Sequence, residues 1–198
     1  MLIRDFEDVV ADLHGVAGLA AGQHPGVPLV LIGHSMGGMI AARYAQRFGA
    51  ELSALVLSGP VLGPWPLPEM LLAMDPFPEI PIDPAVLSRD PEVGRAYAAD
   101  PLVWHGALTR ESLEATVRCL AAIDAGPGFG ALPTLWVHGE EDALVPVDVV
   151  RQGLTKCGAQ ALTQHVYAGA RHEVFNEINK DEVLGDVLAF IEAALSRS

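Results

Sequence analysis

The chain has 198 residues and a formal net charge of −13, and 51% of its residues are hydrophobic while 19% are charged. Disordered chains are poor in apolar residues and rich in charge, so this composition excludes a disordered protein. The length is that of a single domain. The acidic balance argues against a nucleic-acid-binding protein, because such proteins normally carry a basic patch.

The N-terminal residues and the cysteines indicate a compartment. Asp5, Glu7 and Asp8 stand where a secretory signal has an apolar run, and no segment approaches the roughly 18 consecutive apolar residues of a membrane span. Cys119 and Cys157 are too few for a disulfide framework and are interpreted as thiols in a reducing compartment. We therefore expect a soluble, cytoplasmic protein.

Strand and helix patterns alternate along the chain. Runs of branched apolar residues predict buried parallel strands, and apolar residues spaced three and four apart predict amphipathic helices. The expected strands are residues 29–33, 52–58, 134–138 and 162–167, and the expected helices are residues 3–21, 39–48, 84–98, 109–124, 146–157 and 181–196. This order predicts an α/β fold, with a mostly parallel, doubly wound sheet and helices on both faces.

A proline-rich stretch interrupts the alternation. Residues 59–84 hold eight of the fifteen prolines, and proline is excluded from helix interiors and central strands because it lacks an N–H group. We interpret residues 60–130 as a helical cap inserted into a core that residues 1–59 and 131–198 form.

The strongest motif is the segment 33–37, which reads G-x-S-x-G. It directly follows a predicted strand and precedes a predicted helix. In that context the two glycines let the chain turn sharply and lift the serine hydroxyl above the carboxyl edge of the sheet. The N–H groups that open the helix favour a negative oxygen beside the serine. We therefore predict that Ser35 is the nucleophile of a serine hydrolase; the alternative is a glycine-rich turn without chemistry.

A serine hydroxyl is a weak nucleophile unless a histidine removes its proton. With this type of turn, the expected chain order is Ser, then Asp or Glu, then His. Three acids follow the predicted strand 134–138, namely Glu140, Glu141 and Asp142, and each is a candidate for the triad acid. Of the seven histidines, His172 lies in a loop after the last predicted strand and after these acids, so it is the predicted base.

The sequence contains no motif for a phosphate-binding loop or a metal site. There is no G-x-x-x-x-G-K-[ST] for a phosphate loop, and no H-E-x-x-H or C-x-x-C for a metal site. The expectation is an enzyme with no cofactor and no metal.

Several segments resemble the α/β-hydrolase superfamily, and within it the monoacylglycerol lipase and lysophospholipase group. These segments are GHSMGG at 33–38, LVLSGP at 55–60, RDPEV and YAADPLVWHG within 89–106, LWVHGEEDALVP at 135–146 and AGARHEVFNE at 168–177. The resemblance implies an α/β-hydrolase fold in which Ser35 is the nucleophile, Asp142 the acid and His172 the base. It also implies a serine ester hydrolase that acts on lipid esters such as monoacylglycerol.

Two further assignments accompany the resemblance. The backbone N–H of Met36 is the expected donor to the oxyanion of a tetrahedral intermediate. The apolar side chains of the cap, including Trp65, Leu71 and Leu72, are expected to contact the substrate. Such a face also suits peripheral contact with a membrane surface, although ordinary packing of the cap against the core is the competing interpretation.

The sequence departs from the family in one respect. In the family the nucleophile follows the fifth strand, whereas one predicted helix precedes it here. We therefore expect the N-terminal part of the sheet to be missing and the strand 29–33 to be an exposed edge, through which the chain would form homo-oligomers or aggregate. Two alternative functions stay open: another α/β-hydrolase, such as a thioesterase or aminopeptidase, and a catalytically impaired fragment that acts in association.

Overall fold

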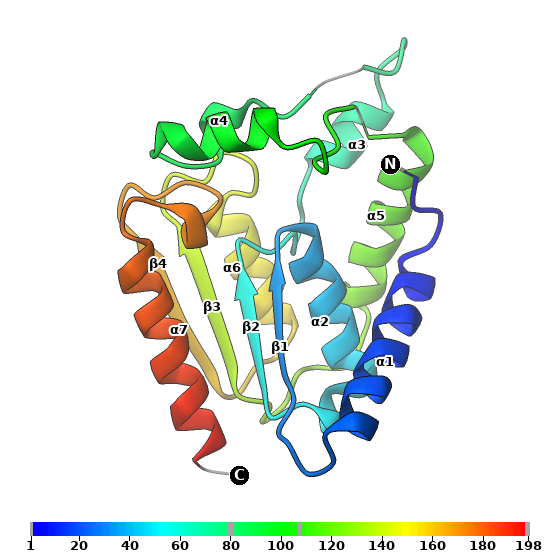
Figure 1. Ribbon diagram of the computed structural model, residues 1–198. Coiled ribbons are helices and arrows are strands. Elements are labelled where there is room, and N and C mark those ends of the chain that lie inside the picture. The colour runs from blue at the N-terminus through cyan, green and yellow to red at the C-terminus, as the bar shows by residue number, and fades with distance from the viewer. Residues whose placement is uncertain (1, 79–80, 107, 197–198) are drawn as a thin grey trace.

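The computed structural model describes residues 2–78, 81–106 and 108–196, and a parallel sheet stands at its centre (Figure 1). The strands of this sheet are β1 (Val30–His34), β2 (Ala54–Ser58), β3 (Thr134–Gly139) and β4 (Leu162–Tyr167). They lie in the order β1-β2-β3-β4, and each neighbouring pair is parallel. The expected strands are therefore confirmed within one or two residues at each end.

Seven α-helices lie in the described part of the chain, and they confirm the expected alternation. They are α1 (Phe6–Gln23), α2 (Met36–Phe48), α3 (Leu67–Leu72), α4 (Pro91–Ala99), α5 (Arg110–Asp124), α6 (Val147–Lys156) and α7 (Lys180–Leu195). The single helix expected over 84–98 is wrong, because the chain forms a 3-10 turn at Pro84–Val86 and starts again at α4. Asp90 causes this second start by accepting a hydrogen bond from the Glu92 N–H, while Pro91 opens the helix.

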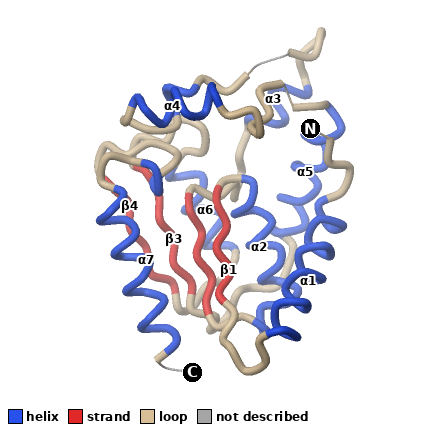
Figure 2. Tube along the Cα trace, viewed as in Figure 1, coloured by secondary structure: helices blue, strands red, loops and turns tan. Residues whose placement is uncertain are grey.

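Alternate side chains of the central strands form two apolar cores. Leu55, Leu57 and Trp136 point to one face of the sheet and pack among side chains of α1, α2, α5 and α6. Val56 and Val137 point to the other face and pack against α7. Figure 2 shows helices on either side of the sheet. The central strands β2 and β3 are covered on both faces, which explains why they are uniformly buried.

The strand β1 is less well covered than the strand beside it. Ile32 is paired with Val56, and neighbouring residues in register point to the same face. Val56 is fully buried whereas Ile32 is 49% exposed. β1 is also the outermost strand of the described sheet, so its edge is unpaired there as predicted, and association of copies through it stays a prediction.

The segment between β2 and β3 divides into two parts. Figure 1 shows α3 and α4 lying beyond the carboxyl ends of the strands, and α5 running down beside α1 and α2. Ala115, Cys119 and Ile123 of α5 belong to the main core, whereas α4 buries no side chain. The cap boundaries at 60 and 130 stay a prediction. In the described ranges no helix combines the length and hydropathy that a membrane span needs.

Candidate active site

The turn between β1 and α2 holds Ser35 in a conformation that is rare for a residue with a side chain. Its φ is 54° and its ψ is −121°, a region that costs about 1–3 kcal/mol and persists only when the surroundings fix it. The backbone supplies that fixation, because the Ser35 N–H donates to the Ser58 carbonyl and its own carbonyl accepts from Val61 N–H. The side chain is thereby turned out at the carboxyl end of β1.

The glycines of the motif do not contribute equally. A Cβ on Gly33 would lie 2.4 Å from the Gly37 carbonyl oxygen, and one on Gly38 would lie 2.6 Å from Pro60 Cβ. A Cβ on Gly37 would meet open space. The steric requirement for glycine therefore falls on Gly33 and on Gly38 just outside the motif, and not on Gly37.

Asp142 lies in the turn that follows β3. Its Oδ1 accepts hydrogen bonds from the N–H groups of Leu144 and Val145, both at 2.9 Å, which leaves Oδ2 to face the neighbouring loop. Burial opposes ionisation of this carboxyl, but hydrogen bonds from His138 and His172 outweigh burial and hold the pKa of Asp142 well below its usual range. The carboxylate is therefore ionised at neutral pH.

His172 joins the other two residues. Its Nδ1 lies 2.7 Å from Asp142 Oδ2, and its Nε2 lies 2.9 Å from Ser35 Oγ. His172 is 3% exposed, and a Cβ on Gly59 would lie 3.3 Å from Nδ1, so glycine lets the chain pass closely beneath the ring. The structure thus brings together the three residues that the sequence singled out, from three loops at one edge of the sheet.

The other two acids do not join this set. Glu140 is exposed and accepts a hydrogen bond from the Gly169 N–H at 3.2 Å, and Glu141 is exposed as well. Of the three candidates, Asp142 alone contacts the predicted base.

His34 lies beside the base, and its side chain contacts Ser58. Its Nδ1 lies 3.1 Å from Ser58 Oγ, and its ring centre lies 4.8 Å from that of His172. Burial and the neighbouring His172 lower the pKa of His34 to about 4. It is therefore neutral at pH 7 and adds no second positive charge beside the base.

Met36 occupies the position expected of an oxyanion donor. It is the first residue of α2, and the first N–H groups of a helix have no acceptor inside the helix. Its N–H is consequently available at the same turn as Ser35. In the residues that the structure covers, no group of three or more His, Cys, Asp or Glu side chains suits a metal ion.

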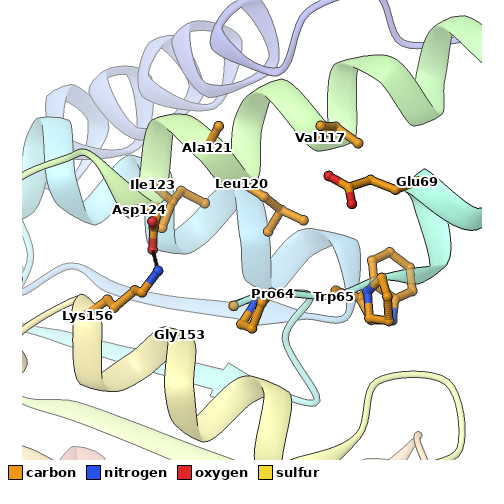
Figure 3. Close-up of a pocket in the computed structure, with 12 residues that line it drawn as sticks. Pro64, Trp65, Glu69, Val117, Leu120, Ala121, Ile123, Asp124, Gly153 and Lys156 are labelled. Atoms are coloured by element: carbon orange, nitrogen blue, oxygen red, sulfur yellow. Dashed lines mark ion pairs between the residues drawn. The ribbon is translucent and has the colours of Figure 1, made fainter.

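Trp65, Leu71 and Leu72 have different surroundings. The indole N–H of Trp65 donates to the Leu144 carbonyl at 3.0 Å, which joins the cap to the turn that carries Asp142. Trp65 also lines a cavity of about 320 Å³ between α3, α5 and α6, which Asp124 and Lys156 border with an ion pair at 2.6 Å (Figure 3). Leu71 and Leu72 are half-buried on α3. None of the three predicted triad residues lines this cavity, so substrate contact by these side chains stays a prediction.

Glu177, which no sequence motif singled out, anchors the loop of the base. Its carboxylate is buried and accepts hydrogen bonds from the N–H groups of Arg171 and Arg89 and from the Arg89 guanidinium. Burial opposes ionisation of this carboxyl too, but the bonds from Arg171 and Arg89 lower its pKa. The network ties the residue before His172 to the start of α4. Its only signal in the sequence was a place inside the segment 168–177 that resembles the family.

Comparisons with known proteins give a family and several relatives for this chain. Residues 1–179 match the family described as serine aminopeptidase, S33. The chain is 37% identical to a monoacylglycerol lipase of Mycolicibacterium smegmatis, over 98% of this chain and 72% of that protein. It is 28% identical to the monoglyceride lipase of Rattus norvegicus, over 99% of this chain and 67% of that protein.

A solved structure supports the fold. The crystal structure of a soluble variant of monoglyceride lipase from Saccharomyces cerevisiae, in complex with a substrate analogue, superposes with a TM-score of 0.77. It is 20% identical, and the match covers 96% of this chain and 69% of that one. The predicted α/β-hydrolase fold is confirmed, with a sheet shorter than the full fold.

Proposed function

The chain belongs to the serine aminopeptidase S33 family, and we propose that it is a carboxylic ester hydrolase that cleaves monoacylglycerols through Ser35, Asp142 and His172. The observation that carries the proposal is the unbroken line of contacts from Asp142 Oδ2 through the imidazole to Ser35 Oγ, at 2.7 and 2.9 Å. The relatives named monoacylglycerol lipase support the choice of substrate.

The geometry supports one proton path. Because Asp142 is ionised, it accepts the Nδ1–H of His172, which leaves the Nε2 lone pair to accept the Ser35 hydroxyl proton. Ser35 Oγ then bonds to the ester carbonyl carbon, and the oxyanion that forms accepts the Met36 N–H. His172 returns the proton to the glycerol oxygen as that bond breaks. Water then attacks the acyl-enzyme by the same path and releases the fatty acid.

The first experiment tests the nucleophile. Ser35→Ala should abolish labelling by a fluorophosphonate and lower ester turnover by about 10⁵–10⁶-fold, while the far-UV circular dichroism stays unchanged. Ser196→Ala is the matched control, because Ser196 is an exposed serine at the end of α7. Labelling that persists in Ser35→Ala would remove Ser35 from the mechanism. A wild-type chain that resists labelling would favour the catalytically impaired alternative.

The second part of the experiment tests the substrate. The family description names an aminopeptidase, so the panel must contain aminoacyl amides and thioesters beside monoacylglycerols of several chain lengths. A higher kcat/KM on long-chain monoacylglycerol than on a short soluble ester is the expected result, and it would support an apolar acyl site under the cap. Preference for an aminoacyl amide would overturn the lipid assignment while leaving the triad intact.

A further inference from the structure

A second histidine lies behind the proposed triad. His138, the fifth residue of β3, is completely buried, and its Nε2 lies 3.2 Å from Asp142 Oδ2. This is the same carboxylate oxygen that faces His172. His138 Nε2 also lies 2.8 Å from the Val145 carbonyl, within the turn that holds Asp142.

Trp136 fixes which nitrogen of His138 carries the proton. The buried indole N–H of Trp136 points at His138 Nδ1 at 3.0 Å, and an indole nitrogen only donates. Nδ1 must therefore present its lone pair, so the single proton of the ring sits on Nε2. That proton faces the Val145 carbonyl and Asp142 Oδ2, both of which accept. A doubly protonated ring would set an N–H against the Trp136 N–H.

We propose that His138 is a positioning residue for the triad carboxylate, held by Trp136 in the neutral form with its proton on Nε2; this inference rests on the proposed function of Asp142 and His172. A neutral donor orients Oδ2 toward His172 without placing a second full charge beside it. The negative charge of Asp142 then stabilises the imidazolium that forms when His172 takes the Ser35 proton.

Two other charged or titratable groups border this buried set. His34 lies beside His172 and is neutral at pH 7 because its pKa is lowered to about 4. The Arg151 guanidinium lies 5.8 Å from the centre of the Trp136 ring, on the side of α6. His34 therefore adds no change of charge near neutral pH, and the fall of the rate on the acidic side of the profile reports on the triad.

The first measurement needs no activity. Histidine ¹⁵N spectra of the intact protein at pH 8 should show Nδ1 of His138 unprotonated and Nε2 protonated. Trp136→Phe, which removes the indole N–H and keeps an aromatic ring, should allow a proton on Nδ1. A proton on Nδ1 of wild-type His138 would overturn the inference, whether or not the chain hydrolyses esters.

The second measurement uses variants of His138. Its Nε2–H is lost in His138→Leu, whereas His138→Gln keeps a donor there, and both variants leave the Trp136 N–H without its acceptor. In His138→Leu we expect kcat to fall about 10–100-fold with little change in KM. Without this donor the Asp142 carboxylate is a stronger base. The pH at which kcat/KM falls on the acidic side of its pH profile (the acid limb) should therefore rise by about half a pH unit.

The Gln variant separates positioning from folding. His138→Gln should restore both the turnover and the position of the acid limb, with rates normalised to active sites counted by fluorophosphonate. If His138→Leu does not fold, the comparison of wild type with His138→Gln and Trp136→Phe still decides the matter. Equal loss in the Gln and Leu variants with an unmoved acid limb would mean that His138 only fills the core, and the proposal would fail.

Discussion

The two halves of the proposed triad are held in place by different means. Ser35 depends on backbone sterics: a positive φ, and close packing around Gly33 and Gly38. Asp142 and His172 depend on polar contacts, because each lies in a loop fixed by hydrogen bonds to buried carboxylates and buried backbone groups. The nucleophile is therefore sensitive to added volume, whereas the acid and the base are sensitive to lost donors and to charge.

After loss of the nucleophile itself, the largest effect should come from the polar half, at Asp142. Asp142→Asn keeps the shape of the acid but exposes His172 to an amide that can donate, which favours the wrong tautomer of the base. Turnover should fall by about 10⁴-fold. Steady-state kinetics on a soluble ester measures it. Glu140→Gln and Glu141→Gln are the controls, since both side chains are exposed away from the imidazole, and a comparable loss in either would reverse the assignment.

A single methyl group added at Gly33 should disrupt the close packing that holds Ser35. Gly33→Ala would place Cβ 2.4 Å from the Gly37 carbonyl oxygen and 2.7 Å from Ala41 Cβ, and overpacking of this kind costs about 1–3 kcal/mol. Urea denaturation should show the loss. Gly37→Ala is the matched control in the same turn, where a Cβ meets open space. Equal stability of the two variants would contradict the steric explanation.

The smallest expected effect is on the pH dependence of stability, through His34, which lies beside His172 and next to Ser35 in the chain. The pKa of His34 is about 4 in the folded protein and about 6.5 when it is exposed. The unfolded chain therefore binds a proton first, so this residue removes stability as the pH falls from 6.5 to 4. His34→Gln should show a smaller drop in Tm across that window than the wild type. An identical drop in both would show that His34 is not the group responsible.

Much of the site could be predicted because its signals are local. The turn around Ser35 lies within five consecutive residues, and the chain order of acid and base follows from the strands that precede them. The choice among Glu140, Glu141 and Asp142 was left to resemblance, because the residues alone do not show which side chain turns inward. The structure orients Asp142 through bonds from Leu144 and Val145 N–H groups.

The supporting residues could not be predicted from pattern. Glu177 and Arg89 are 88 positions apart, and His138 acquires its donor role from a tryptophan two residues earlier on the same side of a buried strand. A buried histidine at a strand end has the same sequence signature whether or not it faces a carboxylate. Such roles depend on tertiary contacts, which periodicity does not report.

The pairing of β2 with β3 has a consequence for how the chain folds and for which insertions and deletions it tolerates. Leu55 of β2 pairs with Thr134 of β3, so the two central strands meet only after the chain has closed over the whole segment that holds α3, α4 and α5. Pairing over such a separation is slow to form. Its entropic cost, however, grows only with the logarithm of loop length, by about 0.6 kcal/mol for each doubling. Insertions and deletions above the site therefore cost the sheet little, and the region over the strand ends can diversify while Ser35, Asp142 and His172 keep their places.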